Sequence, residues 1–179
     1  MTKPMTRTVA VIGAGQMGSG IAQTVAMHGT QVLLADVDLA TAQASVEGID
    51  AALGRLVGKG KLEIAEAEAT LARITPIGGY DAMAEAELII EAATEREPIK
   101  QAIFEKAGKV LGAEAIMASN TSSIPITRMA NFSPDPARFV GLHFFNPVPV
   151  MKLIEVIPGL ATSEETTQRT IAFAEGLGK

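Results

Sequence analysis

Short apolar runs alternate with amphipathic stretches along most of the chain. Runs of aliphatic and β-branched residues predict buried strands at Thr8–Ile12, Gln31–Ala35, Leu88–Glu91, Ile116–Ser119, 139–143 and 153–157. The intervening stretches have helical spacing, and they predict helices over residues 15–28, 96–111 and 163–177, with a short helix starting at Pro125. Residues 39–75 contain no strand-like run and break at Gly58–Lys59–Gly60, which predicts an αα-hairpin.

This alternation of strands and helices indicates an α/β fold. Its sheet is expected to be doubly wound and mainly parallel, with helices on both faces and the αα-hairpin inserted after the second strand. The last two strands are joined by a short proline-rich loop, and we expect them to pair antiparallel near the C-terminus. Ligands of such sheets bind at the carboxyl ends of the strands, so we expect the functional residues there.

Composition narrows the classes of function. The 179 residues carry 15 basic and 20 acidic side chains, a net charge of −5, which argues against nucleic-acid or membrane-surface binding. The chain has no cysteine and two histidines, so we expect no disulfide, no thiol chemistry and no metal site. No apolar run approaches the length of a membrane span, and residues 1–7 are not followed by a secretory signal, so we expect a cytoplasmic protein.

A glycine-rich loop follows the first strand. Gly13, Gly15 and Gly18 fit the pattern G-x-G-x-x-G, with Gln16 and Met17 between the last two glycines. In this pattern the first glycine allows a tight turn, the second lets a pyrophosphate approach the backbone, and the third lets the helix pack on the strand. The loop therefore predicts a dinucleotide site at the start of the helix.

Asp36 ends the second strand, eighteen residues beyond Gly18. A carboxylate there can accept hydrogen bonds from an adenosine ribose and would repel a 2′-phosphate, which favours NAD over NADP. Two alternatives stay open at this point. The loop can be a purely structural turn with Asp36 as a helix cap, or it can bind S-adenosylmethionine in a methyltransferase.

His143 stands where the fifth predicted strand ends, at the carboxyl edge. If the flanking strands pair antiparallel about Pro149, residues whose numbers sum to 298 face each other, and His143 and Glu155 are such a pair. A carboxylate beside an imidazole fixes its tautomer and suits a base that takes a hydroxyl proton. The alternative is a structural pair without a catalytic role. His28, in the last turn of a helix before Gly29, is expected to be a surface residue.

The chain resembles the L-3-hydroxyacyl-CoA dehydrogenases, including the 3-hydroxybutyryl-CoA dehydrogenases. Three segments carry this resemblance: residues 11–23 (VIGAGQMGSGIAQ), 119–123 (SNTSS) and 141–156 (GLHFFNPVPVMKLIEV). The third segment is long and specific, and the match runs in order along essentially the whole chain. The resemblance implies a Rossmann-type domain that binds NAD and an enzyme that oxidises a (3S)-3-hydroxyacyl-CoA to a 3-ketoacyl-CoA, or runs the reverse reaction.

The resemblance also implies roles for individual residues. His143 would be the general acid/base, oriented by Glu155. Ser122 would bond the substrate oxygen near the nicotinamide and meet the acyl-CoA, and Asn146 would contact the cofactor beside the same pocket. Glu95 and Lys100 would lie along the NAD site, and Lys59 would contact the CoA phosphates. A serine that also contacts CoA in some family members corresponds here to Ala52.

Taken alone, these extra residues have plainer interpretations. Ser122 can be a turn hydroxyl bonded to the backbone, and Asn146 a cap before Pro147. Glu95, Lys100 and Lys59 can be ordinary solvated side chains.

The resemblance implies a second, helical domain that completes the substrate pocket and forms the homodimer. We expect residues 1–179 to be the NAD-binding domain, with this C-terminal helical domain absent, an apolar docking surface left bare, and turnover reduced more than NAD(H) binding. Two hypotheses remain: a 3-hydroxyacyl-CoA dehydrogenase domain, or an NAD(H)-binding module without turnover of its own. Acyl-chain length, pathway and physiological direction are not encoded in these motifs.

Overall fold

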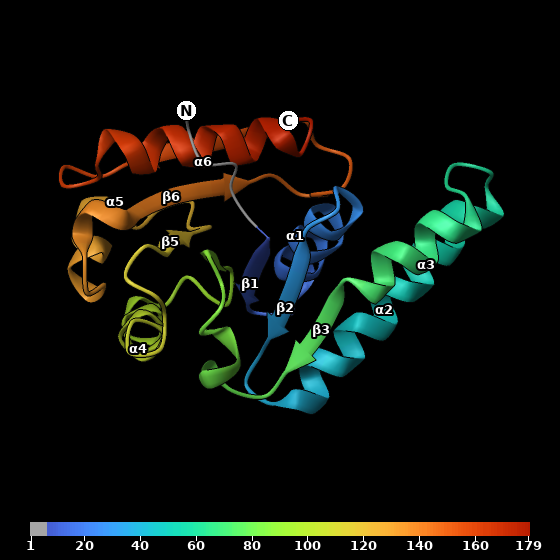
Figure 1. Cartoon of the computed structure of the whole chain (residues 1–179), viewed down its shortest axis with the longest axis horizontal. Helices are drawn as coiled ribbons and strands as arrows, with labels where there is room; N and C mark the ends of the chain where they lie inside the picture. Colours follow the sequence, from blue (N-terminus) through green and yellow to red (C-terminus); the bar gives the residue numbers. More distant parts are fainter. Residues whose placement is uncertain (1–6) are drawn as a thin grey trace.

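The structure is a computed structural model that describes residues 7–179 (Figure 1). Seven strands form one sheet in the order β3-β2-β1-β4-β5-β6-β7. All neighbours pair parallel except β6 and β7, which pair antiparallel. The strands are β1 (Thr8–Ile12), β2 (Gln31–Ala35), β3 (Ile74–Ile77), β4 (Leu88–Glu91), β5 (Ile116–Ser119), β6 (Phe139–Phe144) and β7 (Ile154–Pro158). The expected α/β, doubly wound, Rossmann-type sheet is confirmed.

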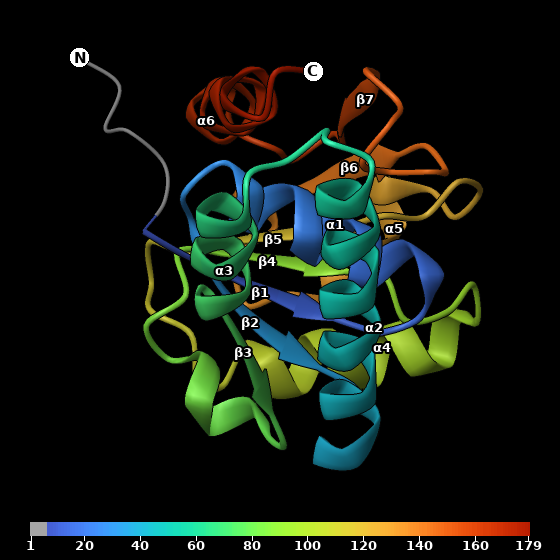
Figure 2. The same cartoon turned by 90° about the vertical axis from the view of Figure 1, so that its right-hand side faces the viewer.

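Helices cover both faces of this sheet (Figures 1 and 2). The α-helices are α1 (Gln16–Met27), α2 (Leu39–Gly58), α3 (Ile64–Ala72), α4 (Glu97–Ala107), α5 (Ile126–Met129) and α6 (Glu164–Gly176), with short 3₁₀ turns η1 (Tyr80–Met83), η2 (Ala130–Phe132) and η3 (Pro136–Arg138). One apolar core lies between the sheet and α1, α2 and α6. A second core lies between the opposite face and α4, α5 and η1. Alternate strand residues, such as Val9 and Ala10, are fully buried on opposite faces, as expected for a sheet covered on both sides.

The expectation that residues 39–75 contain no strand is wrong at its end. Ile74–Ile77 forms β3, an edge strand that pairs with Val32–Ala35 of β2. Its four residues include Pro76, which lacks a backbone N–H, and this obscures the strand pattern in the sequence. An edge position tolerates such a proline because only one side of the strand needs hydrogen bonds. The rest of the segment is the predicted hairpin, with α2 ending at Gly58 and α3 beginning at Ile64.

Local signals explain where several helices begin and end. Asp38 caps α2, since its Oδ1 accepts a hydrogen bond from the Thr41 N–H at 2.7 Å, and this bond holds the pKa of the Asp38 carboxyl below its ordinary value. Ser163 caps α6 in the same way. Gly29 follows α1 with φ of +90°, the left-handed geometry that glycine adopts readily. α4 is shorter than the helix predicted over residues 96–111: it ends at Ala107, and residues 108–110 form turns.

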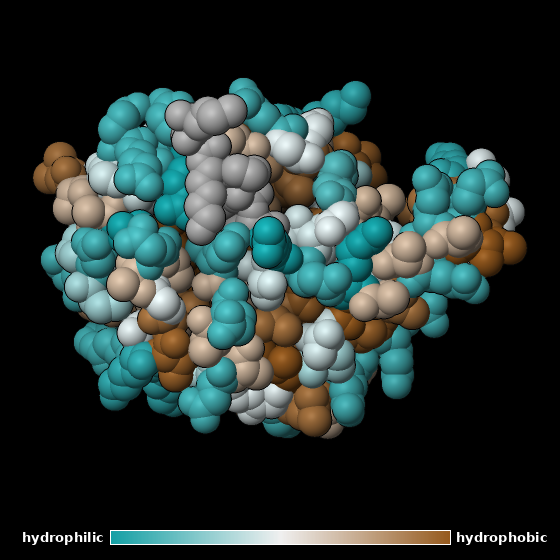
Figure 3. Space-filling model, in the orientation of Figure 1, coloured by the Kyte–Doolittle hydropathy of each residue, from teal (hydrophilic) through white to brown (hydrophobic). Residues whose placement is uncertain are grey.

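The α2–α3 pair projects from the body of the molecule, and hydrophobic side chains on the surface are interspersed with polar ones in the view of Figure 3. Several large apolar residues are exposed on either side of β7: Val150 is 72% exposed and Leu153 53% before the strand, and Leu160 is 93% exposed after it. Elsewhere Val37 is 90% exposed. Within residues 7–179, no helix has both the length and the apolar character that a membrane span requires. The sequence expectation about a signal at residues 1–7 falls almost wholly outside the described residues.

Candidate active site

The parallel strands bring five predicted site segments to one edge of the sheet. The glycine loop follows β1, Asp36 follows β2, Glu95 follows β4, Ser122 follows β5, and His143 lies near the end of β6. Because parallel strands end at the same edge, residues more than a hundred positions apart converge there. The carboxyl edge of the sheet is therefore the candidate site.

Gly13 and Gly15 of the glycine loop differ in what a side chain would meet at each position. Gly13 has φ of +101°, and a β-carbon there would lie 2.5 Å from the Ala93 Cα. A β-carbon at Gly15 would meet no atom within 4 Å, so this is the position that a ligand can approach. Gly15 caps α1 without a side-chain hydrogen bond, and the first turn of α1 holds no acidic residue. The backbone N–H groups at this helix end thus suit a phosphate.

Asp36 braces the loop from the next strand. Its Oδ2 accepts the Ala14 N–H at 2.5 Å, and its Oδ1 accepts the Val37 N–H at 2.7 Å. Each oxygen keeps acceptor capacity for a ribose hydroxyl. Beside Asp36 is a pocket of about 360 Å³ lined by apolar and polar side chains, among them Val37, Tyr80, Met83, Ile99, Ile103 and Lys106. Motif analysis missed these residues because they gather from three separate segments.

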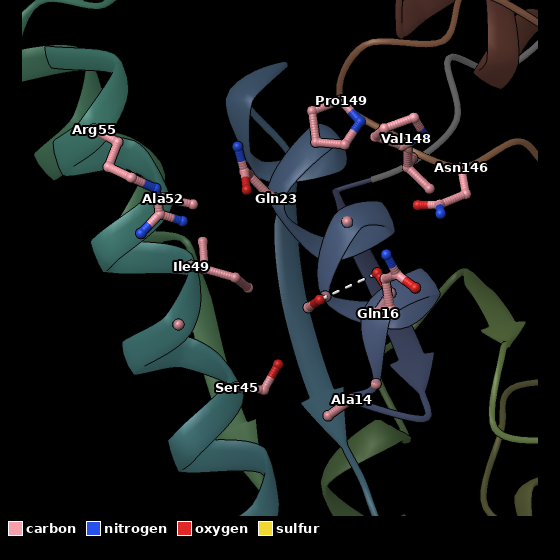
Figure 4. Close-up of a pocket in the computed structure, with 15 residues that line it drawn as sticks. Ala14, Gln16, Gln23, Ser45, Ile49, Ala52, Arg55, Asn146, Val148 and Pro149 are labelled. Atoms are coloured by element: carbon pink, nitrogen blue, oxygen red, sulfur yellow. Dashed lines mark hydrogen bonds between the residues drawn. The ribbon is translucent and has the colours of Figure 1, made fainter. Parts of the chain in front are cut away.

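A larger cleft of about 600 Å³ runs between α1 and α2, and Figure 4 shows its lining. Gln16 and Gln23 line the side formed by α1, while Ala52 and Arg55 line the side formed by α2. The loop that carries Asn146, Val148 and Pro149 closes one end of the cleft. Asn146 thus lies at the end of this cleft, and its predicted contact with the cofactor remains a prediction. Arg55 is a cleft residue that the sequence reasoning missed.

Glu95 and Ser122 are brought together by the loops after β4 and β5. Glu95 Oε1 accepts the Ser122 N–H at 2.9 Å and the Ser122 hydroxyl at 3.2 Å, and Glu95 Oε2 accepts the Thr121 hydroxyl at 2.7 Å. Partial burial raises the pKa of the Glu95 carboxyl, but the bonds from Ser122 and Thr121 and the charge of Lys100 outweigh it and leave that pKa below its ordinary value. Glu95 is thus an anchored acid rather than a freely solvated one.

His143 and Glu155 oppose each other across the β6–β7 ladder, in the predicted register. His143 Nδ1 lies 2.9 Å from Glu155 Oε2. The imidazole side chain is 18% exposed, and its ring lies against the Phe145 ring with centroids 4.6 Å apart. The pair is therefore formed, oriented and open to a ligand at the carboxyl edge. His28, in contrast, bonds through Nδ1 to the Thr24 carbonyl at the end of α1.

Two predicted lysines lie in different surroundings. Lys100 is not the solvated side chain that the plainer interpretation offers: it is 1% exposed, and its ammonium lies 2.5 Å from a buried Glu91 oxygen. The burial of Lys100 could have been predicted from the sequence, because helical spacing puts it on the same face of α4 as Ile103, Phe104 and Ala107. Lys59 caps the end of α2 at the exposed tip of the hairpin, one turn beyond Arg55. Its contact with CoA remains a prediction.

The sequence as a whole matches one family of dehydrogenases. The family model of the 3-hydroxyacyl-CoA dehydrogenase NAD-binding domain matches residues 8–179. The chain belongs to this family. Its glycine loop is therefore that of an NAD-binding domain, which sets aside both the purely structural turn and the methyltransferase site.

Relatives and solved structures agree with the family. The chain is 45% identical over 173 residues to a 3-hydroxyadipyl-CoA dehydrogenase of Escherichia coli, covering 97% of this chain and 36% of that protein. It is 46% identical over 169 residues to a probable 3-hydroxybutyryl-CoA dehydrogenase of Deinococcus radiodurans, covering 94% of this chain and 60% of that protein. The crystal structure of (S)-3-hydroxybutyryl-CoA dehydrogenase from Ralstonia eutropha superposes with a TM-score of 0.95 at 43% identity, over 98% of this chain and 62% of that one.

The residues of this NAD-binding domain fit a dinucleotide. Gly15 leaves open space at the start of α1, where the backbone N–H groups can meet a pyrophosphate. Asp36 stands at the mouth of the pocket of about 360 Å³, where a ribose and an adenine ring can lie. The chain spans between about a third and about three fifths of the length of these curated relatives.

Proposed function

We propose that this chain binds NAD(H) at the carboxyl edge of its sheet and serves the reversible oxidation of a (3S)-3-hydroxyacyl-CoA to a 3-ketoacyl-CoA. The observation that carries the proposal is the 2.9 Å contact between His143 Nδ1 and Glu155 Oε2, at the same edge of the sheet as an NAD-binding loop. The names of the relatives, which act on 3-hydroxybutyryl-CoA or 3-hydroxyadipyl-CoA, support the substrate class.

His143 would act as the base. A carboxylate that accepts a hydrogen bond from the Nδ1–H group favours the tautomer in which Nε2 carries the lone pair. Nε2 can then take the proton of the 3-hydroxyl, and Glu155 stabilises the imidazolium that forms. NAD, when bound, supplies the acceptor for the hydride that leaves C3. In the reverse direction the imidazolium returns its proton to the new alkoxide oxygen.

Other residues would bind and orient. Ser122 would turn its hydroxyl from Glu95 to the substrate oxygen, while its N–H stays bonded to Glu95. Asn146 offers its amide to the cofactor from the end of the cleft. Gln16, Met17 and Glu95 would complete the surroundings of the cofactor, with Lys100 buried behind Glu95. Along the α1–α2 cleft, Arg55 provides a cation for the phosphates of CoA, with Lys59 further out. An acyl-CoA is the partner that this set of groups fits.

A second candidate is an NAD(H)-binding module without turnover of its own. The observation that favours it is the run of exposed apolar side chains just before β7, where Val150, Met151 and Leu153 lead into the strand that carries Glu155. A further wall covering this surface would exclude water and fix the substrate, and both contribute heavily to rate.

One experiment separates the two candidates. NADH oxidation by the purified chain is followed on addition of acetoacetyl-CoA, and NADH binding is measured by fluorescence, which has little protein background because the chain has no tryptophan and one tyrosine. For the dehydrogenase, His143→Gln is expected to lower turnover by about 10²–10⁴-fold, the usual contribution of general acid–base catalysis, while NADH affinity is unchanged.

The other outcomes are equally informative. NADH binding without oxidation would favour the binding module. Loss of NADH affinity in His143→Gln would make His143 a structural residue, and no NADH binding by the unmodified chain would overturn the proposal as a whole.

A further inference from the structure

A buried ion pair lies beneath the candidate active site. Glu91, at the end of β4, is fully buried, and Lys100 of α4 is 1% exposed. Lys100 Nζ lies 2.5 Å from Glu91 Oε2, and the buried Ser119 hydroxyl donates to the same oxygen at 3.0 Å. Burying two charges costs a large desolvation energy, which good geometry and added hydrogen bonds offset. This pair has both, and neither Glu91 nor Ser119 was among the sequence-predicted site residues.

Glu91 of the pair is linked to the glycine loop through Ala93. Glu91 Oε1 accepts the Ala93 N–H at 2.8 Å, which fixes the first turn of the loop after β4. Ala93 in turn packs against the backbone of Gly13, with the atoms too close to admit a β-carbon. Glu91 therefore supports the backbone on which the glycine loop rests.

The pair also reaches the loop after β5. Lys100 Nζ lies 4.0 Å from Glu95 Oε2, and Glu95 holds both the N–H and the hydroxyl of Ser122. Ser119, which bonds Glu91, directly precedes this loop. One buried carboxylate is thus linked to three segments of the candidate site: the glycine loop, the loop that carries Glu95, and the loop that carries Ser122.

We propose that Glu91 is a positioning residue that, directly and together with Lys100, holds these three segments in the arrangement that receives NAD(H). The inference rests on the proposed function and adds a residue to it. A packed apolar pair of similar volume can replace a buried ion pair at little cost in folding stability. What apolar side chains cannot replace is the set of directed bonds to Ala93, Ser119 and Glu95. The contribution of the pair to this site is therefore orientation.

The test removes the charges together, so that neither remains buried alone. The double variant Glu91→Met/Lys100→Met is compared with Glu114→Gln/Arg138→Met, which removes an ion pair of 3.0 Å remote from the site. The control pair links residues just before β5 and β6, at the opposite edge of the sheet. NADH affinity is measured by fluorescence titration, folding by thermal unfolding, and local order by amide hydrogen exchange.

The first variant is expected to fold and to bind NADH about tenfold more weakly or worse, the equivalent of one lost charge-assisted hydrogen bond. Amide exchange at Ala93 and Ser122 is expected to accelerate, with the core of β4 and β5 unchanged. The control is expected to bind NADH as the unmodified chain does. If the first variant fails to fold, Glu91→Gln/Lys100→Met, which keeps the side-chain length at position 91 and leaves no charge buried alone, is measured instead and is expected to weaken NADH binding in the same direction.

A folded variant with unchanged NADH affinity and unchanged exchange at Ala93 and Ser122 would overturn the inference and leave the proposed function intact. The same holds for unchanged affinity in Glu91→Gln/Lys100→Met. Failure of the unmodified chain to bind NADH would count against the proposed function itself. The two failures are therefore distinguished by which protein loses binding.

Discussion

A β-carbon placed on Gly18 would lie 1.6 Å from the carbonyl oxygen of Gly13. No side-chain rearrangement relieves this contact, because the obstructing atom belongs to the backbone of the turn itself. Gly18→Ala must therefore push α1 away from β1, and overpacking of this kind typically costs about 1–3 kcal/mol. We expect a lower unfolding temperature together with loss of NADH binding.

Gly15→Ala is the matched control for this prediction. A β-carbon there meets no protein atom within 4 Å, so folding stability should change little. NADH affinity should nevertheless fall, because the methyl group would occupy space that a pyrophosphate needs. Thermal unfolding and NADH titration of both variants check the pair, and equal stability of the two variants would contradict it.

Asp36→Ala is expected to weaken NAD binding much more than NADP binding. The carboxylate can accept hydrogen bonds from a ribose hydroxyl but repels a phosphate at the same place. Loss of its bond to the Ala14 N–H disturbs the loop for both cofactors alike, so the informative quantity is the ratio of the two dissociation constants. Equal weakening for both cofactors would contradict the role given to Asp36.

Glu155→Gln is expected to lower turnover by about 10²-fold without changing NADH affinity, because the amide cannot stabilise the imidazolium of His143 as a carboxylate does. Steady-state rates and NADH titration of the same preparation check this. Glu165→Gln, on the exposed surface of α6, is the control and should leave both quantities unchanged. A Glu155→Gln variant as active as the unmodified chain would indicate that the pair is structural.

Glu95 makes stability depend on pH in the acid range. The bonds from Ser122 and Thr121 and the charge of Lys100 hold the folded-state pKa of Glu95 below its unfolded value, so the folded state binds fewer protons there. The stabilisation is present above the unfolded pKa, near 4.3, and is lost as pH falls through the folded pKa.

Unfolding by urea at several pH values checks this prediction on Glu95→Gln. The free energy of unfolding of the unmodified chain should exceed that of the variant at neutral pH, and the difference should shrink as the solution is acidified below about pH 4. A difference that is constant with pH would show that the charge of Glu95 plays no part.

Much of the site was predictable because short-range rules govern it. The G-x-G-x-x-G spacing located Gly13, Gly15 and Gly18, and the antiparallel register about Pro149 placed His143 opposite Glu155. β3 was missed because its four residues include a proline, and pairing with β2, not local pattern, makes it a strand.

Tertiary packing concealed the rest. Lys100 and Glu91 are polar residues in apolar surroundings, and only the meeting of α4 with β4 shows that each is the partner of the other. The charged residue in the strand run LIIE was a usable signal, because a charge in an otherwise apolar strand is expected to have a partner. The pocket beside Asp36 had no local signal, since its walls come from segments far apart in sequence.

Tyr80 lines that pocket and is the single tyrosine of a chain without tryptophan. Partial burial, together with the nearby negative charge of Glu91, raises the pKa of its phenol, so it stays protonated at neutral pH. Tyrosine emission overlaps the absorption of a reduced nicotinamide, which makes resonance energy transfer between them measurable. The molecule therefore contains its own optical reporter of cofactor occupancy, placed at one known position and in need of no label.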